Sequence, residues 1–392
     1  MLVKLAWKNI WHKPLHALLS VILLASSLAI MALIMLIQKQ FETQFTKQLE
    51  DVDLIIGAQG SPLQLVLSSL YHVDSPTGNM ALSEANKYLK HKHVKSYIPL
   101  AFGDNFAGFK IVGTNALFFK KYNAKLAKGK MFEKDFDVVV GHQVALNKNL
   151  RIGSTFYGTH GEGEEGHVHV DKGYRVVGVL SPNGSVLDFL ILCTTKSVWN
   201  IHKNEDKTEN QEEITAALLK MKNKMSILLW QREVASNSKL QAVSPAIEIN
   251  RLFSLFGIGI DGLKYLAYGL MLISGISIFI ALYNALKERK YEFALMRLSG
   301  ASQLQLFLSL LIESILLCLV GFFVGIVLSR IGLYFISLQA KSEFKMQFDI
   351  WDFSIQIDGI LLLFTILIGI FAAIIPAIKS YFMTISKTIN DA

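Results

Sequence analysis

Four long apolar runs stand out from an otherwise polar sequence. They cover residues 15–37, 263–286, 304–328 with an apolar continuation to 336, and 357–378. The first run has no Asp, Glu, Lys or Arg, and as a helix it would extend about 34 Å, enough to cross the hydrocarbon core of a bilayer. It is too long for the apolar part of a signal peptide, and no small-x-small cleavage pattern closes it. We therefore predict four transmembrane helices, the first of them uncleaved.

The polar segment between the first two runs predicts a folded domain of mixed α/β structure. Ser61 followed by Pro62 is typical of a helix start, and Thr208 with Gln211 resembles a capping box that predicts a helix at 212–222. Strand candidates rich in Val, Ile and aromatic residues lie at 53–57, 136–141, 154–157, 174–180 and 189–194. The predicted fold class is a four-helix membrane protein with a large mixed α/β extracytoplasmic domain. The predicted domains are residues 1–37, 38–262 and 263–392.

Two amphipathic segments join this domain to the membrane. Apolar side chains recur on one helical face in each segment, at Phe41, Phe45 and Leu49 and at Leu252, Phe253 and Phe256. The spacing favours two stalk helices that leave the bilayer and pack together. The alternative is two unrelated helices lying on the membrane surface. The glycines at 257, 259 and 262 would weaken a continuous helix and mark a candidate hinge.

Charge distribution gives the expected orientation. Hydrophobic residues make up 52% of the chain and charged residues only 18%, with a net charge of +8. Lys and Arg cluster at the N-terminus, in the 287–302 loop and in the C-terminal tail, and no DNA-reading motif accompanies them. By the positive-inside rule, both termini and this loop are cytoplasmic. We expect a multi-pass protein of the inner (plasma) membrane, in contact with lipid and without a nucleic-acid partner.

The 287–302 loop holds the most specific stretch of the sequence. Between two predicted membrane helices, it is charged and amphipathic, and it ends in Ser-Gly-Ala. Glu288 and Glu292 are four residues apart and would share one helix face. Such a helix could transmit force from a docked partner, whereas the alternative is a solvated loop carrying topology charges. The candidate coupling residues are Glu288, Arg289, Glu292, Phe293, Arg297 and Gly300.

This stretch resembles the coupling segment of FtsX/MacB-like permeases of ATP-binding-cassette (ABC) transporters, roughly E-R-x-x-E-[IF]-x-x-[LM]-[RK]-x-x-G-A. Weaker likenesses in the family's order are Trp7-Lys8-Asn9-Ile10, Val140-Gly141, Val176-Val177-Gly178-Val179 and Pro376-Ala377. The resemblance implies one helix, a large periplasmic domain, then three helices. It also implies a second permease copy, identical or different, and a cytoplasmic ABC ATPase whose movement reaches the outer domain. Export, extraction or mechanotransmission would follow.

Sequence motifs for catalysis are missing, so we expect a non-enzymatic subunit. The chain has no G-x-x-x-x-G-K-[ST] phosphate loop, and ATP would act through the partner subunit. Cys193 and Cys318 fall at different predicted depths, so the fold should hold without disulfides. Glu313 lies inside the third apolar run, where a carboxylate is costly, unless the helix begins so late that it reaches the headgroups. Asn284 is a candidate hydrogen-bond partner for it.

A histidine-rich stretch at 160–171 is the second distinctive feature. His160, His167 and His169, with neighbouring carboxylates, offer ligands suited to zinc. The alternative is a flexible acidic loop that happens to contain histidines. A looser likeness, in Gly57 to Gln64 and Tyr71-His72, is to a subgroup of these permeases with His-rich outer loops. Two other functions therefore stay open: a zinc-linked uptake permease, with or without a periplasmic partner, and a non-transporting envelope regulator or scaffold.

Overall fold

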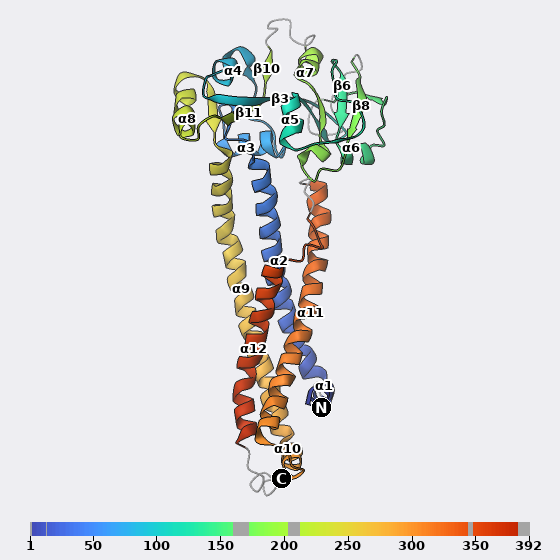
Figure 1. Ribbon diagram of the computed structural model, residues 1–392, viewed down its shortest axis with the longest axis vertical. Helices are drawn as coiled ribbons and strands as arrows, with labels where there is room; N and C mark the ends of the chain where they lie inside the picture. Colours follow the sequence, from blue (N-terminus) through green and yellow to red (C-terminus); the bar gives the residue numbers. More distant parts are fainter. Residues whose placement is uncertain (1, 13, 160–171, 203–211, 344–347, 383–392) are drawn as a thin grey trace. The chain divides into compact units, whose positions relative to one another are not determined.

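The computed structural model describes residues 2–12, 14–159, 172–202, 212–343 and 348–382 (Figure 1). The chain forms two compact units. We call residues 1–42 with 255–392 the helical unit, and residues 43–254 the α/β domain. Two helices, α2 and α9, contribute residues to both units.

The helical unit contains the four predicted membrane helices. Its helices are α1 (Leu2–His12), α2 (Pro14–Leu49), α9 (Pro245–Glu288), α10 (Lys290–Leu298), α11 (Gln303–Glu343) and α12 (Ile355–Tyr381). Among the described residues, α2, α9, α11 and α12 are long and apolar enough to span a membrane, which confirms the prediction. The α9 helix runs unbroken through Gly257, Gly259 and Gly262, so the expected weak point is not a break in the helix. The modest cost of glycine in a helix interior is too small to interrupt a helix of this length.

Small residues let α2 and α11 approach closely. A Cβ built on Gly325 would lie 2.9 Å from the carbonyl oxygen of Ala25 and from Cβ of Leu28, and one on Gly321 would lie 2.8 Å from Leu24. Buried side chains from α2, α9, α11 and α12 form one apolar cluster around this contact. Lipid tails are as apolar as these side chains, so close packing rather than water exclusion holds such helices together.

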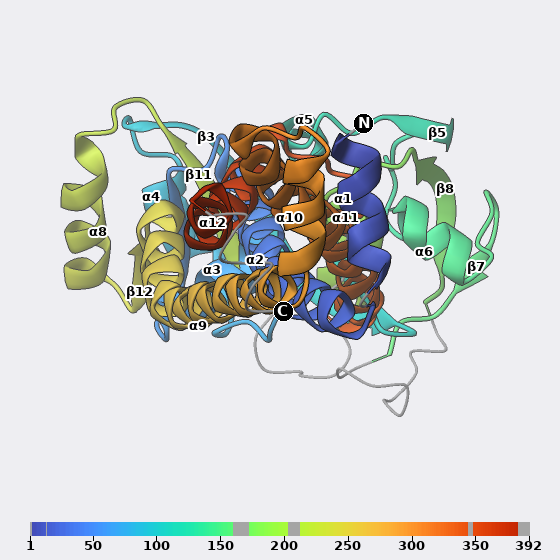
Figure 2. The same ribbon diagram turned by 90° about the horizontal axis from the view of Figure 1, so that it is seen from below.

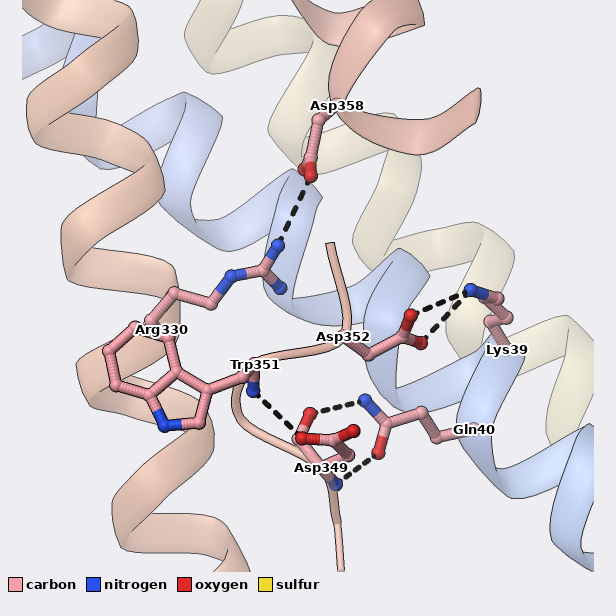
Figure 3. A network of polar contacts seen from close by, with 7 residues as sticks. All are labelled: Lys39, Gln40, Arg330, Asp349, Trp351, Asp352 and Asp358. Atoms are coloured by element: carbon pink, nitrogen blue, oxygen red, sulfur yellow. Dashed lines mark hydrogen bonds and ion pairs between the residues drawn. The ribbon is translucent and has the colours of Figure 1, made fainter. Parts of the chain in front are cut away.

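Polar contacts fasten the turn before α12 to α2 (Figure 3). Lys39 Nζ donates to both carboxylate oxygens of Asp352, at 2.9 and 3.2 Å. The Gln40 side chain donates to the Asp349 carbonyl oxygen at 2.8 Å and accepts from the Asp349 backbone N–H at 2.7 Å. These two hydrogen bonds satisfy the backbone N–H and C=O groups of Asp349, which lies outside any helix or strand.

The same turn lies beside an ion pair between α11 and α12. Arg330 Nη2 lies 3.2 Å from Asp358 Oδ2 (Figure 3), and the Arg330 guanidinium lies 5.0 Å from the centre of the Phe353 ring. Both charged side chains are largely buried. The pair and the Lys39 and Gln40 contacts together join α2, α11 and α12 at one end of the helical unit.

A mixed sheet organises the α/β domain. Within the described residues its strand order is β12-β1-β11-β3-β4-β9-β6-β8-β5, with β7 paired to β8. The β4–β9 and β6–β8 pairs are parallel and the other pairs antiparallel. The strands are β1 (Leu54–Ala58), β3 (Val94–Phe106), β4 (Phe109–Thr114), β5 (Leu126–Gly129), β6 (Asp137–Val140), β7 (Thr155–Phe156), β8 (Tyr174–Leu180), β9 (Ile191–Thr194), β11 (Ala216–Met221) and β12 (Leu240–Val243). A separate pair joins β2 (Met80–Ala81) and β10 (Glu213–Ile214).

Helices cover both faces of this sheet, which explains why its central strands read as continuous apolar runs. The helices are α3 (Pro62–Leu70), α4 (Leu82–Leu89), α5 (Ala116–Lys121), α6 (His142–Asn147), α7 (Thr195–His202) and α8 (Ser226–Asn237), with a 3-10 turn, η1, at Val186–Phe189. One core cluster gathers side chains of α4, α6, α7 and α8 with alternate strand residues such as Leu54 and Ile56. On the other face α3 packs so closely that a Cβ at Gly57 would meet the Leu65 side chain.

Most of the predicted strands exist, and one predicted helix is wrong. Strands β6, β7, β8 and β9 fall within the predicted segments, and β1 ends one residue beyond its segment. Ser61 accepts the Gln64 N–H at the start of α3, as expected. The segment 212–222 instead forms β10 and β11. Its Ala-Ala-Leu-Leu sequence has high helix propensity, but β11 is buried between β1 and β3, and pairing on both sides overrides that preference.

The predicted stalk contact is present at one pair of rings. Phe45 of α2 and Phe253 of α9 lie in the part of each helix that belongs to the α/β domain, with ring centres 6.0 Å apart. Phe45 also stacks on Tyr71 at 4.4 Å, and the Tyr71 hydroxyl donates to the Phe45 carbonyl oxygen at 2.9 Å. Phe256 is exposed instead. Both cysteines, Cys193 and Cys318, are free and buried.

Lys121 satisfies the C-terminal end of α2. Its ammonium donates to the carbonyl oxygens of Gln48 and Glu50, each at 2.8 Å. The last carbonyls of a helix have no partner within the helix, so a lysine here replaces water. Burial lowers the pKa of Lys121 to about 8, although the carboxylates of Asp51 and Glu50 oppose the shift.

We predict a pH-dependent contribution of Lys121 to stability. The folded-state pKa of about 8 lies below the ordinary 10.5, so between these values the folded protein releases a proton that the unfolded chain keeps. Wild type should therefore gain stability relative to Lys121→Met as pH rises through this window. Thermal unfolding in detergent measures the difference. The exposed neighbour Lys120, changed to Met, is the control, and the same pH dependence in both variants would contradict the assignment.

Candidate functional site

The predicted coupling segment forms a short helix of its own, α10, between α9 and α11. The chain leaves helical geometry at Arg289 (φ −96°, ψ 17°), and α10 begins at Lys290. Figures 1 and 2 show α10 lying crosswise to the long helices of the helical unit. The expectation that Glu288 and Glu292 share one helix face is wrong, because the turn places Glu288 at the end of α9 and Glu292 in α10.

An apolar cluster fastens α10 to the long helices. Phe293 is fully buried and packs in one cluster with Leu286 of α9, Leu306 and Leu310 of α11, and Ala377 of α12. Burying a phenylalanine side chain stabilises a fold by about 1.5–3 kcal/mol. Phe293 therefore holds α10 in place and is inaccessible to a partner protein.

Charged groups add a second attachment at Arg289. Arg289 Nε lies 2.9 Å from Glu292 Oε2 and its Nη1 lies 3.7 Å from Glu313 Oε2, with only 11% of the Arg289 side chain and 7% of the Glu313 side chain exposed. The Arg289 guanidinium also lies 5.3 Å from the centre of the Phe293 ring. One arginine thus links the α9–α10 turn to α11.

Glu313 therefore has a different partner from the one expected. Asn284 is exposed on α9, while Arg289, just beyond the end of that helix, reaches the carboxylate. Glu313 lies about 15 Å along α11 from its start, and its side chain is buried against neighbouring residues. A buried carboxylate needs a cation nearby, and Arg289 supplies it.

The end of α10 is shaped by Gly300 and the next helix cap. Gly300 has φ +96°, a left-handed conformation that favours glycine, and its N–H bonds to the Arg297 carbonyl oxygen at 3.1 Å. The Arg297 guanidinium donates to the Ala301 carbonyl oxygen at 3.0 Å. Ser302 and Gln305 then form a reciprocal capping box at the start of α11. Gly300 and Arg297 thus stabilise the turn between α10 and α11.

The outward face of α10 carries three apolar side chains that the sequence analysis did not single out. Tyr291, Leu295 and Leu298 are spaced at i, i+4 and i+7 and are each at least two-fifths exposed. Glu292 is half-exposed beside them. The amphipathic pattern of 290–298 was visible in the sequence, but which side faces outward depends on where Phe293 packs. The exposed stripe is a docking surface of the kind that a partner helix or groove can cover.

No group of three or more His, Cys, Asp or Glu side chains suited to a metal occurs within residues 2–12, 14–159, 172–202, 212–343 and 348–382. His160, His167 and His169 lie outside the described residues. Zinc binding by this stretch stays a prediction from the sequence.

Two family models cover most of the chain. The MacB-like periplasmic core domain matches residues 16–236, and the FtsX-like permease C-terminal domain matches residues 265–389. The protein is thus a membrane permease of the ABC transporter class. It belongs to the FtsX/MacB-like permease family, with one helix, an α/β domain and three further helices in that order.

Solved structures of periplasmic and extracellular regions are also similar. The periplasmic region of MacB from Actinobacillus actinomycetemcomitans matches at 14% identity and a TM-score of 0.36, covering 52% of this chain and 92% of that one. The extracellular domain of the noncanonic ABC-type transporter YknZ from Gram-positive bacteria matches at 12% identity and a TM-score of 0.31, covering 49% and 99%. No curated protein matches the sequence.

We predict that Arg289 and Glu313 are energetically coupled. Arg289→Met leaves a buried carboxylate without its cation and should lower the free energy of unfolding by about 3 kcal/mol or more. Adding Glu313→Met removes that unpaired charge, so the double variant should be more stable than the sum of the single effects implies. Thermal unfolding in detergent compares the variants, with the exposed Lys287→Met as control. Strictly additive effects would contradict the coupling.

Proposed function

We propose that this chain is the permease subunit of an ABC complex that transmits ATP-driven movement from a separate cytoplasmic ATPase to the α/β domain. One observation carries the proposal: α10 presents an exposed apolar stripe while Arg289 and Phe293 anchor its other side. A partner that pushes or turns α10 acts on α9, α11 and α12 together. ATP hydrolysis belongs to the partner, and this chain is not the enzyme.

In this proposal the α10 residues divide into two groups. Tyr291, Leu295 and Leu298 contact the ATPase, with Glu292 at the edge of the contact. Arg289, Phe293, Arg297 and Gly300 hold the helix and its following turn in position. This division predicts that exposed apolar substitutions weaken docking with little loss of stability, because their side chains have few contacts to lose in the free protein.

The route of the movement follows the chain itself. From α10 it enters α9 and α11 directly, and α9 is a single helix from Pro245 to Glu288. A continuous helix carries axial and rotational displacement along its length without an intervening hinge. We propose that work is done on a cargo or partner at the α/β domain, and that a second permease copy completes the complex.

The orientation belongs to the proposal as well. The Lys and Arg of the short loops support cytoplasmic termini, a cytoplasmic α10 and an α/β domain outside the inner membrane. In this orientation the α10 stripe meets the ATPase, and the α/β domain meets envelope components.

The docking prediction uses Leu295→Ser with Leu298→Ser. The double variant should insert and fold normally, because both side chains are exposed. Its affinity for a co-expressed ATPase subunit should fall about tenfold or more, as for two contact residues at the centre of an interface. Co-purification and stimulated ATP hydrolysis measure the effect.

A matched control keeps the test specific. Leu146→Ser with Ile152→Ser removes two similarly exposed apolar side chains from the α/β domain and should leave both readouts unchanged. Unchanged ATPase binding in the α10 variant would overturn the proposed docking surface. Equal losses in both variants would show a general folding effect instead.

The topology prediction uses single cysteines in a background lacking Cys193 and Cys318. Lys196→Cys is chosen because Lys196 is exposed, whereas its neighbour Ser197 is fully buried. On intact spheroplasts an impermeant thiol reagent should label position 196 and spare Lys290→Cys, and permeabilised cells should label both. Labelling of position 290 from outside would reverse the orientation.

A further inference from the structure

An exposed apolar stripe lies on α8 of the α/β domain. Met225 is 85% exposed, Leu228 64% and Leu229 70%. Single exposed leucines are common on protein surfaces, but three large apolar side chains at adjoining positions form a patch that typically marks an interaction site. Nothing in the proposed docking of an ATPase to α10 uses these residues.

Helix geometry fixes this stripe on the outer face of α8. Met225, which precedes α8 in helical geometry, is three residues from Leu228 and four from Leu229, so the three side chains share one side of the helix. The opposite face is committed to the core, since Trp230 and Val234 are buried there. The three apolar side chains therefore stay exposed however the helix packs, unless a partner covers them.

Basic residues adjoin the stripe in its own segment: Lys222 and Lys224 directly precede Met225, and Arg232 lies four residues after Leu228 on the same side of α8, while Glu233 lies four residues after Leu229. The turn after α4 is bonded to the segment that leads into α8, because the backbone N–H of Lys222 donates to the His93 carbonyl oxygen at 2.9 Å and its side chain to the Lys92 carbonyl oxygen at 2.8 Å. The His91 ring lies 4.4 Å from the Trp230 ring, on the core side of α8. These contacts hold the 91–93 turn against the start of the α8 segment, on the side of the helix opposite the stripe.

The charge imbalance of these segments is large. Residues 82–95 and 222–239 together contain eight lysine and arginine side chains and two glutamates. All eight basic residues are exposed: Lys87, Lys90, Lys92, Lys95, Lys222, Lys224, Arg232 and Lys239. They lie in the α/β domain, away from the short loops between membrane helices, so the topology rule does not account for them.

We propose that the α8 stripe with its basic border is the docking site for a partner protein that presents an acidic amphipathic helix. The apolar face of such a helix covers Met225, Leu228 and Leu229, and its carboxylates face the basic border formed by Lys222, Lys224 and Arg232. Charge complementarity of this kind accelerates association and suppresses wrong partners. A simple polyanion would use the lysines but would leave the apolar stripe exposed, so a protein partner fits both features.

The test measures peptide binding to the full-length protein in phosphatidylcholine nanodiscs. The probe is a fluorescein-labelled helical peptide about five turns long, with leucines on one face and glutamates on the other. A second peptide carries lysines in place of the glutamates. Fluorescence anisotropy, with empty nanodiscs as background, should show binding of the acidic peptide about tenfold or more tighter than that of the basic one, falling as salt rises.

Variants separate the two halves of the site. Leu228→Ser with Leu229→Ser, and Lys222→Glu with Lys224→Glu, should each weaken binding about tenfold or more. Controls change equally exposed residues elsewhere in the domain, Leu146→Ser with Ile152→Ser and Lys120→Glu with Lys128→Glu. These controls should retain wild-type affinity.

Four outcomes would overturn the proposal. The first is equal binding of the acidic and basic peptides, and the second is wild-type affinity in either α8 variant. The third is competition by polyglutamate that is as effective as competition by the unlabelled acidic peptide, which would indicate a polyanion site. The last is displacement of the peptide by phosphatidylglycerol vesicles in a manner that depends on Leu228 and Leu229, which would indicate a lipid surface. None of these readouts depends on the ATPase, so this proposal and the docking of α10 succeed or fail separately.

Discussion

The ion pair between Arg289 and Glu313 fixes the position of α10, and the candidate coupling site depends on it. A glutamate buried in the third membrane helix is tolerable only with a cation nearby, and the α9–α10 turn delivers that cation. Because Arg289 also contacts Glu292 and the Phe293 ring, the same residue sets where α10 starts and which of its faces is buried. The outward stripe of α10 follows from this inward attachment.

The bilayer imposes its constraint on the rest of the helical unit. Without a hydrophobic difference between lipid and side chain, the helices rely on close contacts, and the glycines of α11 allow α2 to approach. Polar groups gather near the ends of the apolar runs, with Arg289 and Glu313 at one end and the Lys39, Gln40 and Arg330 contacts at the other. These contacts join the α9–α10 turn to α11 near one end of the apolar runs, and α2, α11 and α12 to one another near the other.

The α/β domain solves a different problem, that of burying a sheet on both faces in water. Its central strands are apolar throughout because helices cover each face, and α8 shows the consequence for the surface. The α8 helix gives Trp230 and Val234 to the core and is left with Leu228 and Leu229 outside. Water does not favour that arrangement in an isolated protein, so the exposed stripe and its basic border have their simplest physical explanation in a partner.

The sequence by itself determined the four membrane helices, because each apolar run is long enough to cross a bilayer and water cannot accommodate it. It also determined the strands rich in Val and Ile, and it located the α10 segment. Only the tertiary structure decided the strand state of 216–221, where pairing with β1 and β3 outweighs helix propensity. The partner of Glu313 and the outward face of α10 were likewise decided there. Both depend on a turn at Arg289 and on contacts between helices far apart in the chain, and local periodicity does not contain that information.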